Sequence, residues 1–244
     1  MNQAAPLYIH YRGKLSQSHL FAELPSDQLD KMMESFRFET WRKKTQSSNQ
    51  QLNKRFYVII DGRIETIIIN PISGKSIALA IIGAGDVFDI VTLLDHKEHE
   101  PIAVALDDVQ LLSAPIDSIR HWLDIYHEFN HNFMPYLAKR MRIRENLISD
   151  LALYDTPTRL ARLLLRYIKC NHDDSHHNHH AIPLFHNLTH ETLAHMLGSA
   201  RQVVNKHLQA LKQEGIITTE HHQWTIDDLH ALEKKAGQTL KNIS

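Results

Sequence analysis

The segment from Leu188 to Ile217, LTHETLAHMLGSARQVVNKHLQALKQEGII, constrains the fold of this chain more than any other part of its sequence. Its apolar residues recur at helical spacing in two short runs, and Gly198 stands between them, where a tight turn favours a residue without a side chain. Thr189 is placed to cap the first helix, while Ser199 and Gln202 form an S-x-x-Q capping box that predicts a second helix beginning at Ser199. Two short helices joined in this way form the unit that places one helix in the major groove of DNA.

The second predicted helix has an apolar inner side and a polar outer side. We expect its inner side to consist of Val203, Val204, Leu208 and Leu211, and its end to fall at Gly215. Arg201 is expected to point outward, where an arginine can donate two hydrogen bonds to guanine, and Lys206 can bind phosphate or guanine. His207 is interpreted as partly buried. An ordinary helical hairpin is the alternative reading. The predicted contacts to double-stranded DNA are Thr189, Ser199, Arg201, Gln202, Asn205 and Lys206.

The composition bounds the class of protein. The 244 residues allow one large domain or two modest ones. No apolar run comes near the ~18 residues that span a bilayer, and the first residues lack the apolar core of a signal peptide. We therefore expect a cytoplasmic protein with no membrane partner. A single cysteine, Cys170, excludes an internal disulfide. The net charge is −1, so a DNA-binding chain must concentrate its positive charge locally. We expect that charge at Arg159, Arg162, Arg166, Arg201, Lys206 and Lys212.

Strand patterns dominate the first half of the chain. Residues 56–60 (FYVII), 63–69 (RIETIII) and 77–82 (IALAII) are rich in β-branched side chains, and glycine-containing turns separate them. Short strands of this kind predict an antiparallel barrel or jelly roll. A helix from Pro25 to about Phe36 is expected to pack on its side.

The pattern becomes helical from Ile116 onward. Six residues follow 3-4-3-4-3 spacing along one predicted helix: Met134, Leu137, Met141, Arg144, Ile148 and Leu151. This spacing suits the pairing of two helices. A second copy of the chain is the favoured partner, and the chain's own barrel is the alternative. Pro135 then belongs in the first turn of the helix or at a kink.

Three further elements are expected in the second half of the chain. Asp155-Thr156-Pro157 ends the pairing helix and begins the next one, over residues 158–169. The segments 216–219 and 223–226 predict a two-stranded wing, and a last helix follows from Asp227.

A strand barrel, a long pairing helix and a winged helix-turn-helix, in that order, resemble the CRP/FNR superfamily of bacterial transcription regulators. The likeness covers nearly the whole chain from Leu20, and besides the helix-turn-helix it rests on YVIIDGRI (57–64), GAGDVF (83–88), LAKRM (137–141) and LALYDTPTRLARLLL (151–165). It implies an α+β fold. The expected parts are an N-terminal antiparallel β-roll of the cyclic-nucleotide-binding kind (residues 20–125), a dimerisation helix (126–155) and a C-terminal winged helix-turn-helix domain (156–244).

The resemblance also implies partners. The family members are homodimers that read pseudo-palindromic sites, with half-site centres about 10 bp apart or a multiple of that. RNA polymerase is the further partner that the resemblance implies. The family usually reads DNA with an Arg-Glu pair and a later Arg, where this chain has Arg201, Gln202 and Lys206. Because glutamate accepts from cytosine and glutamine suits adenine, we expect a shifted target sequence.

The positions that hold cyclic AMP in the family differ in this chain. Asp89-Ile90 replaces the Gly-Glu pair that meets the ribose, Glu100-Pro101 replaces the Arg-Ser pair that holds the phosphate, and Arg144-Glu145 replaces the Thr-Ser pair that meets adenine. An acid beside a phosphate is unfavourable, and proline has no N–H to donate. We therefore expect no response to cyclic AMP in the usual mode. These six residues form a candidate pocket for an effector that is unknown or absent.

The chain contains nineteen histidines, which suggest a second hypothesis about the effector that it senses. His176, His177, His179 and His180 are dense enough to bind a metal, and His96 and His99 could serve a metal or haem. A metal- or haem-responsive regulator is therefore the alternative. The His-rich stretch has no fixed ligand spacing, so a solvated linker is preferred and neither a metal site nor a cofactor is predicted. No enzyme is expected either, because the sequence lacks the common nucleophile and phosphate-binding motifs.

Overall fold

The computed structural model describes residues 6–47, 54–88, 90–97, 101–172, 188–220 and 223–237. Contacts within the chain divide it into two compact units, Met1–Lys75 with Leu79–Glu145, and Ser76–Ala78 with Asn146–Ser244. The division falls inside the longest helix, α6 (His127–Leu153). No described helix has both the length and the apolar character that a membrane span requires.

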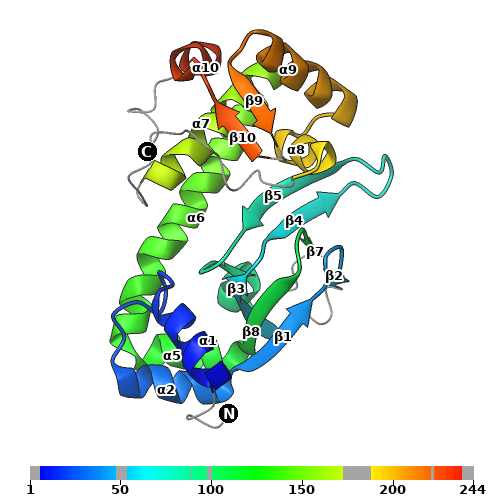
Figure 1. Cartoon of the computed structure of the whole chain (residues 1–244). Coiled ribbons are helices and arrows are strands. Elements are labelled where there is room, and N and C mark those ends of the chain that lie inside the picture. Colours follow the sequence, from blue (N-terminus) through cyan, green and yellow to red (C-terminus); the bar gives the residue numbers. More distant parts are fainter. Residues whose placement is uncertain are drawn as a thin grey trace. The chain divides into compact units, whose positions relative to one another are not determined.

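Two antiparallel four-stranded sheets form the β-roll (Figure 1). The first has the order β1-β8-β3-β6, with β1 at Arg37–Trp41, β8 at Val109–Pro115, β3 at Arg55–Asp61 and β6 at Val87–Phe88. The second has the order β2-β7-β4-β5, with β2 at Gln46–Ser47, β7 at Ile102–Ala105, β4 at Ile64–Ile69 and β5 at Ser76–Ile82. The three strands expected from the sequence are thereby confirmed as β3, β4 and β5.

Gly62 makes the turn between β3 and β4 possible. Its φ is +84°, and a Cβ at this position would lie 2.7 Å from the carbonyl oxygen of Asp108. Only glycine combines this backbone conformation with so close an approach of another chain segment. The pattern of β-branched runs broken by glycine therefore follows from the tight turns of the roll.

Helices cover the outer face of the first sheet. They are α1 (Pro6–Ser16), α2 (Ser26–Ser35), α5 (Ile116–Ile125) and the first part of α6; a short helix, α4 (Ile90–Asp95), follows β6. The core beneath them is aromatic, with Phe21, Phe56, Phe129 and Phe133 fully buried. A second core, around Ile59, Ile64 and Leu111, fills the interior of the roll. The α+β class and the β-roll are confirmed.

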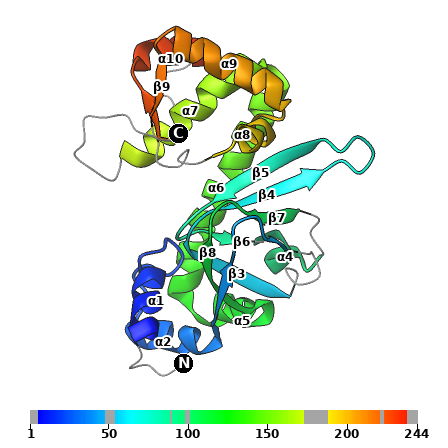
Figure 2. The same ribbon diagram turned by 45° about the vertical axis from the view of Figure 1, so that its right-hand side comes forward.

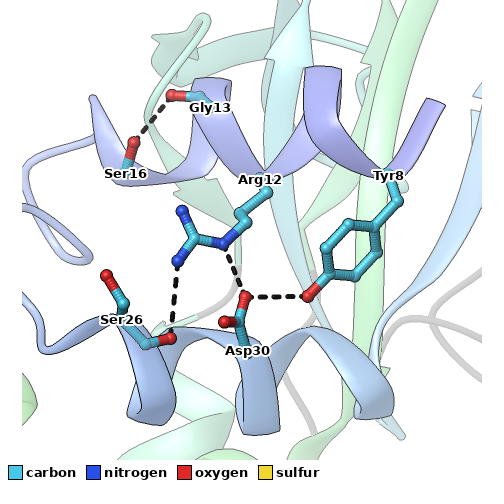
Figure 3. Close-up of polar contacts among 6 residues, drawn as sticks. All are labelled: Tyr8, Arg12, Gly13, Ser16, Ser26 and Asp30. Carbon is cyan, nitrogen blue, oxygen red and sulfur yellow. Dashed lines mark hydrogen bonds and ion pairs between the residues drawn. The ribbon is translucent and has the colours of Figure 1, made fainter. Parts of the chain in front are cut away.

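Helix α1 was not expected from the sequence. It buries Tyr8, Tyr11 and Leu15 in the aromatic core. Figure 3 shows how it is fixed to α2: the Tyr8 hydroxyl donates to Asp30 at 2.9 Å, and Nε of Arg12 donates to the same oxygen at 2.5 Å. Arg12 holds the pKa of the Asp30 carboxyl below its ordinary value. The folded first unit therefore begins before residue 20, where the sequence analysis had placed its start.

Helix α6 begins at His127, so Pro135 lies in its interior. Of the two places expected for Pro135, the first turn is excluded, because the buried residues Phe129 and Phe133 extend the helix toward the N-terminus to complete the aromatic core; the other, a kink, stays a prediction. The predicted pairing stripe includes Met134, Met141 and Ile148, and these side chains are 52%, 55% and 66% exposed. Leu137 of the same stripe is partly buried against the aromatic core, so part of the stripe packs within the chain.

The second unit contains the winged helix-turn-helix. Its elements are α7 (Thr156–His172), α8 (His190–Leu197), α9 (Arg201–Gln213), β9 (Ile217–Glu220), β10 (Gln223–Ile226) and α10 (Leu229–Ala236). Helix α7 packs against both α10 and α9 (Figure 2). Strand β9 pairs with β10 in the expected wing (Figure 1). The Asp155 carboxylate accepts from the Thr158 amide at 3.1 Å, so α7 begins where the Asp-Thr-Pro sequence predicted.

Candidate nucleic-acid interface and effector pocket

Thr189 caps helix α8. Its hydroxyl oxygen accepts from the amide of Thr192 at 3.1 Å, and α8 then buries Leu193, Ala194 and Leu197 on its inner side. The cap expected from the sequence is confirmed. The Thr189 side chain is occupied by the cap, so its part in any DNA contact is to fix the beginning of α8.

Gly198 forms the turn between α8 and α9. Its φ of +55° is left-handed, and its amide donates to the carbonyl of His195 at 3.2 Å, while the Ser199 amide donates to Ala194 at 3.0 Å. These two bonds are the paired closure that often ends a helix at glycine. A Cβ at Gly198 would lie 2.8 Å from Cδ2 of Leu151, so packing as well as backbone conformation selects glycine.

The predicted capping box of Ser199 and Gln202 is wrong. Helix α9 begins at Arg201, and the preceding residue, Ala200, makes no side-chain cap. The reason is that the Ser199 amide still closes α8, so the chain cannot turn into the next helix until two residues later. The Ser199 hydroxyl instead lies 3.4 Å from the hydroxyl of Thr156 in α7.

Helix α9 has a buried apolar side and an exposed side that is mostly polar. Val204, Leu208 and Leu211 are buried. Arg201, Gln202, Asn205 and Lys206 are all exposed on the other side. Val203, expected on the inner side, is 39% exposed, because it stands about 100° around the helix from its buried neighbour Val204. His207 is half-buried, as the sequence analysis interpreted it.

The positive charge of this unit is more localised than the sequence suggested. Asp150, which is only 2% exposed, accepts from Arg162 Nε at 2.6 Å and lies 2.5 Å from an Nη atom of Arg166. These two arginines hold α7 to α6 and are largely covered, so they do not supply the DNA-facing charge expected of them. Arg201 and Lys206 are both exposed and remain candidates for that role.

His190, at the first position of α8, lies close enough to this charge to be affected by it. Partial burial lowers the pKa of its imidazole, and the charges of Arg201 and Lys212 lower it further. The side chain therefore favours its neutral form near pH 7. The cation of Lys212 lies 5.6 Å from the ring centre of Trp224 in the wing, so this lysine connects α9 to β10.

A cavity of about 90 Å³ lies in the first unit, between the roll and α6. Of the six residues proposed for an effector, Ile90, Pro101 and Arg144 line it, Glu145 does not, and Asp89 and Glu100 lie outside the described residues. Sequence reasoning missed Leu137, Arg140 and Met141, which also line the cavity. Their spacing with Arg144, at i, i+3, i+4 and i+7 on one helix, is the signal that could have found them.

Beside this cavity, a polar cluster joins the turn before β6 to α6. Asp86 accepts from the Gly83 amide and the Tyr136 hydroxyl, both at 3.1 Å, and lies 3.8 Å from Arg140. Burial, followed by the charge of Asp86, raises the pKa of Tyr136 well above its ordinary value. The Arg140 side chain therefore lines the cavity and also forms an ion pair with Asp86.

The histidines named for a metal fall mostly outside the structure. His176, His177, His179, His180 and His99 are not among the described residues. Among the described residues, no three histidine, cysteine or acidic side chains lie together in an arrangement that could hold a metal ion.

Two family models match the chain. The model of the cyclic nucleotide-binding domain matches residues 48–126, and that of the Crp-like helix-turn-helix domain matches residues 158–235. The first corresponds to most of the β-roll with α5, and the second to α7 through α10. The matched ranges thus include the strand side of the cavity and the exposed side of α9, whereas the α6 residues that line the cavity lie between them.

Two curated relatives and one solved structure extend this result. The chain is 29% identical to the CRP-like cAMP-activated global transcriptional regulator of Mycobacterium tuberculosis, over 75% of this chain and 80% of the relative. It is 28% identical to the global nitrogen regulator of Synechococcus elongatus, over 88% and 95%. A mutant of CooA from Carboxydothermus hydrogenoformans has the same fold, with a TM-score of 0.71, 22% identity, and 89% and 93% of the two chains covered.

Proposed function

Because the chain belongs to the CRP/FNR family of DNA-binding transcription regulators, we propose that it acts as a homodimer that reads a pseudo-palindromic site through α9. The observation that carries this proposal is the exposed row of Arg201, Gln202, Asn205 and Lys206 opposite the buried side of α9. A helix of this kind, with its polar side exposed and its apolar side packed on a neighbouring helix, fits the major groove.

The dimer is supported by the exposed stripe on α6. Met134, Met141 and Ile148 are spaced seven residues apart and remain more than half exposed in one chain. Burying a large apolar side chain stabilises a structure by about 1.5–3 kcal/mol, so a second α6 alongside the first would gain substantially from this stripe. Two copies related by a two-fold axis would also present two copies of α9, one for each half-site.

Base reading is assigned to Arg201 and Gln202. Arg201 suits the O6 and N7 atoms of guanine, and the amide of Gln202 suits the N6 and N7 atoms of adenine. Lys206 lies one turn further along α9 and suits a phosphate or guanine. We also assign RNA polymerase as a partner and the cytoplasm as the location, since a regulator must reach both DNA and polymerase.

We further propose that cyclic AMP in its usual binding mode is not the signal. The described lining of the cavity between the roll and α6 does not offer the contacts that the family uses for this ligand. Pro101, which lines it, has no N–H to offer a phosphate, and Arg144 stands where the family's adenine contact is expected. Arg140 and Arg144 suit a small anion better than a nucleotide base.

The test is selection from a random pool of DNA duplexes by the purified, chelator-stripped chain at one stated salt concentration. We expect a two-fold symmetric motif, recovered equally without ligand and with added cyclic AMP. A motif that appears only with cyclic AMP would contradict the proposed independence, and a motif without symmetry would contradict the dimer. Weak binding without any motif would indicate a missing effector, and the same assay with metals, haem and anionic metabolites would search for it.

A further inference from the structure

The geometry points to a divalent transition-metal site that two copies of the chain build together, from His127 and His131 of each copy. This inference rests on the proposed pairing of α6. The metal ion would bind at the beginning of that helix. This region is separate from both the effector cavity and the histidine-rich stretch 172–180.

The two histidines already lie side by side on α6. They stand four residues apart, one helical turn, and their ring centres are 6.5 Å from each other. Both side chains are exposed, and within the described part of the chain neither imidazole has a hydrogen bond or an ion pair. Together with Asn130, Met134 and Pro135 they line an open hollow of about 390 Å³. The rings can therefore turn toward a common ligand without losing a partner.

The position of His127 relates this pair to the dimer axis. It stands seven residues before Met134, so it continues the row of exposed residues formed by Met134, Met141 and Ile148. In two parallel helices packed along that row, equivalent positions of the two copies face each other across the axis. His127 would then meet its symmetry mate, and His131, one turn later, would flank it on each side.

Two imidazoles from one chain are too few for a stable transition-metal site. Four nitrogens in a tetrahedral arrangement are the usual set for a structural zinc ion, at about 2.0–2.1 Å each, and imidazole also suits Cu²⁺ and Ni²⁺. The described residues of one chain do not bring a third ligand to the pair. The partner subunit's copies of the same two residues would complete the set, so the site depends on the dimer.

An ion held in this way would favour the dimer. A ligand that binds only the associated form strengthens association by a factor of one plus the ratio of its free concentration to its dissociation constant, roughly 100-fold when that ratio is 100. The consequence is specific, because added metal should tighten the dimer without altering the DNA sequence that α9 reads.

The experiment uses the full chain with His172, His176, His177, His179 and His180 replaced by asparagine, which removes the competing imidazoles of the histidine-rich stretch. Co²⁺ is titrated first, because tetrahedral nitrogen coordination gives it intense visible absorption, and Zn²⁺ then displaces it. The dimer dissociation constant is measured by sedimentation, in chelator and in Zn²⁺. We expect one ion for every two chains, the tetrahedral spectrum and a tighter dimer in Zn²⁺.

His127→Ala and His131→Ala should each weaken metal binding by at least the roughly 10–100-fold that loss of an outer-shell partner costs. The matched control is His121→Ala with His230→Ala, two exposed histidines elsewhere in the chain, which should leave metal binding unchanged.

One ion per single chain, or unchanged metal binding in the His127 and His131 variants, would overturn the inference. A dimer in chelator that binds no ion would overturn it while leaving the proposed function intact. A chain that stays monomeric in both conditions would contradict the pairing of α6 itself.

Discussion

The Tyr136 hydroxyl donates to the Asp86 carboxylate at 3.1 Å and accepts from the Val87 amide at the same distance, so one α6 side chain holds both the turn and the start of β6. Asp86 also accepts from the Gly83 amide within the same turn. The GAGDVF motif is thus explained by structure: its aspartate closes the turn and anchors α6 to the roll. The cavity is lined by Val87 and Phe88 of β6 and by Leu137 and Arg140 of α6, so Tyr136 and Asp86 join two of the elements that form it.

Tyr136→Phe should destabilise the chain by about 1–3 kcal/mol, because the buried Val87 amide would lose its hydrogen-bond partner. Urea unfolding of the two proteins measures this difference. Tyr126→Phe is the matched control, since no hydrogen bond of the Tyr126 hydroxyl is found among the described residues, and it should change the free energy by less than about 0.5 kcal/mol. Equal effects of the two substitutions would contradict the anchoring role.

Asp150→Asn should cost about 3–5 kcal/mol of unfolding free energy, because it removes the carboxylate that neutralises Arg162 and Arg166 in a covered site. Asp117→Asn breaks a comparable contact, the 2.8 Å ion pair with Arg120, but Asp117 is 88% exposed. Exposed pairs are worth about 0–1 kcal/mol, so this control should be nearly neutral. A small effect at Asp150 would mean that α7 is held to α6 by other contacts.

Met141→Asp should dissociate the proposed dimer, because it puts a charge into the stripe that two α6 helices would bury. Ile143→Asp is the control: Ile143 is 41% exposed on the same helix but stands two residues further on, off the stripe. Sedimentation should show monomers for the first variant and dimers for the second. The opposite order of effects would place the interface on another side of α6.

Arg201→Ala should weaken specific DNA binding by about 1–3 kcal/mol and relax the preference at one guanine per half-site. Lys206→Ala should instead weaken binding to all sequences about evenly, and lower the salt dependence by about one ion per copy if Lys206 holds phosphate. Titrations of the selected site and a scrambled duplex at several salt concentrations separate the two. Loss of discrimination in the Lys206 variant equal to that of Arg201→Ala would show that Lys206 reads a base.

What the sequence could predict was mostly local. The strands β3 to β5, the wing, the Thr189 cap and the buried side of α8 follow from neighbouring residues, since periodicity and turn glycines act over short distances. Helix α1 was not predicted because it exposes Leu7 and Ile9 while it buries Tyr8 and Tyr11, so its sequence has no one-sided apolar pattern.

The errors came from contacts between residues that are distant in sequence or from competing local signals. Arg162 and Arg166 look like DNA-facing charge until Asp150, in the preceding helix, is brought against them. Ser199 and Gln202 have capping-box spacing, but the same serine amide is needed to close α8 at Gly198. The cavity shared by α6 and the roll depends on tertiary packing, so only part of its lining could be named in advance.

The measurement that tests the account most directly is a pair of selections from one random duplex pool, with the natural chain and with Gln202→Glu. Gln202 is exposed at the beginning of α9, so the substitution should leave the fold unchanged. We predict two symmetric motifs that differ at one position in each half-site, with adenine preferred by the natural chain and cytosine by the variant. Identical motifs, or a change in only one half of the site, would contradict the claim that two copies of α9 read the DNA.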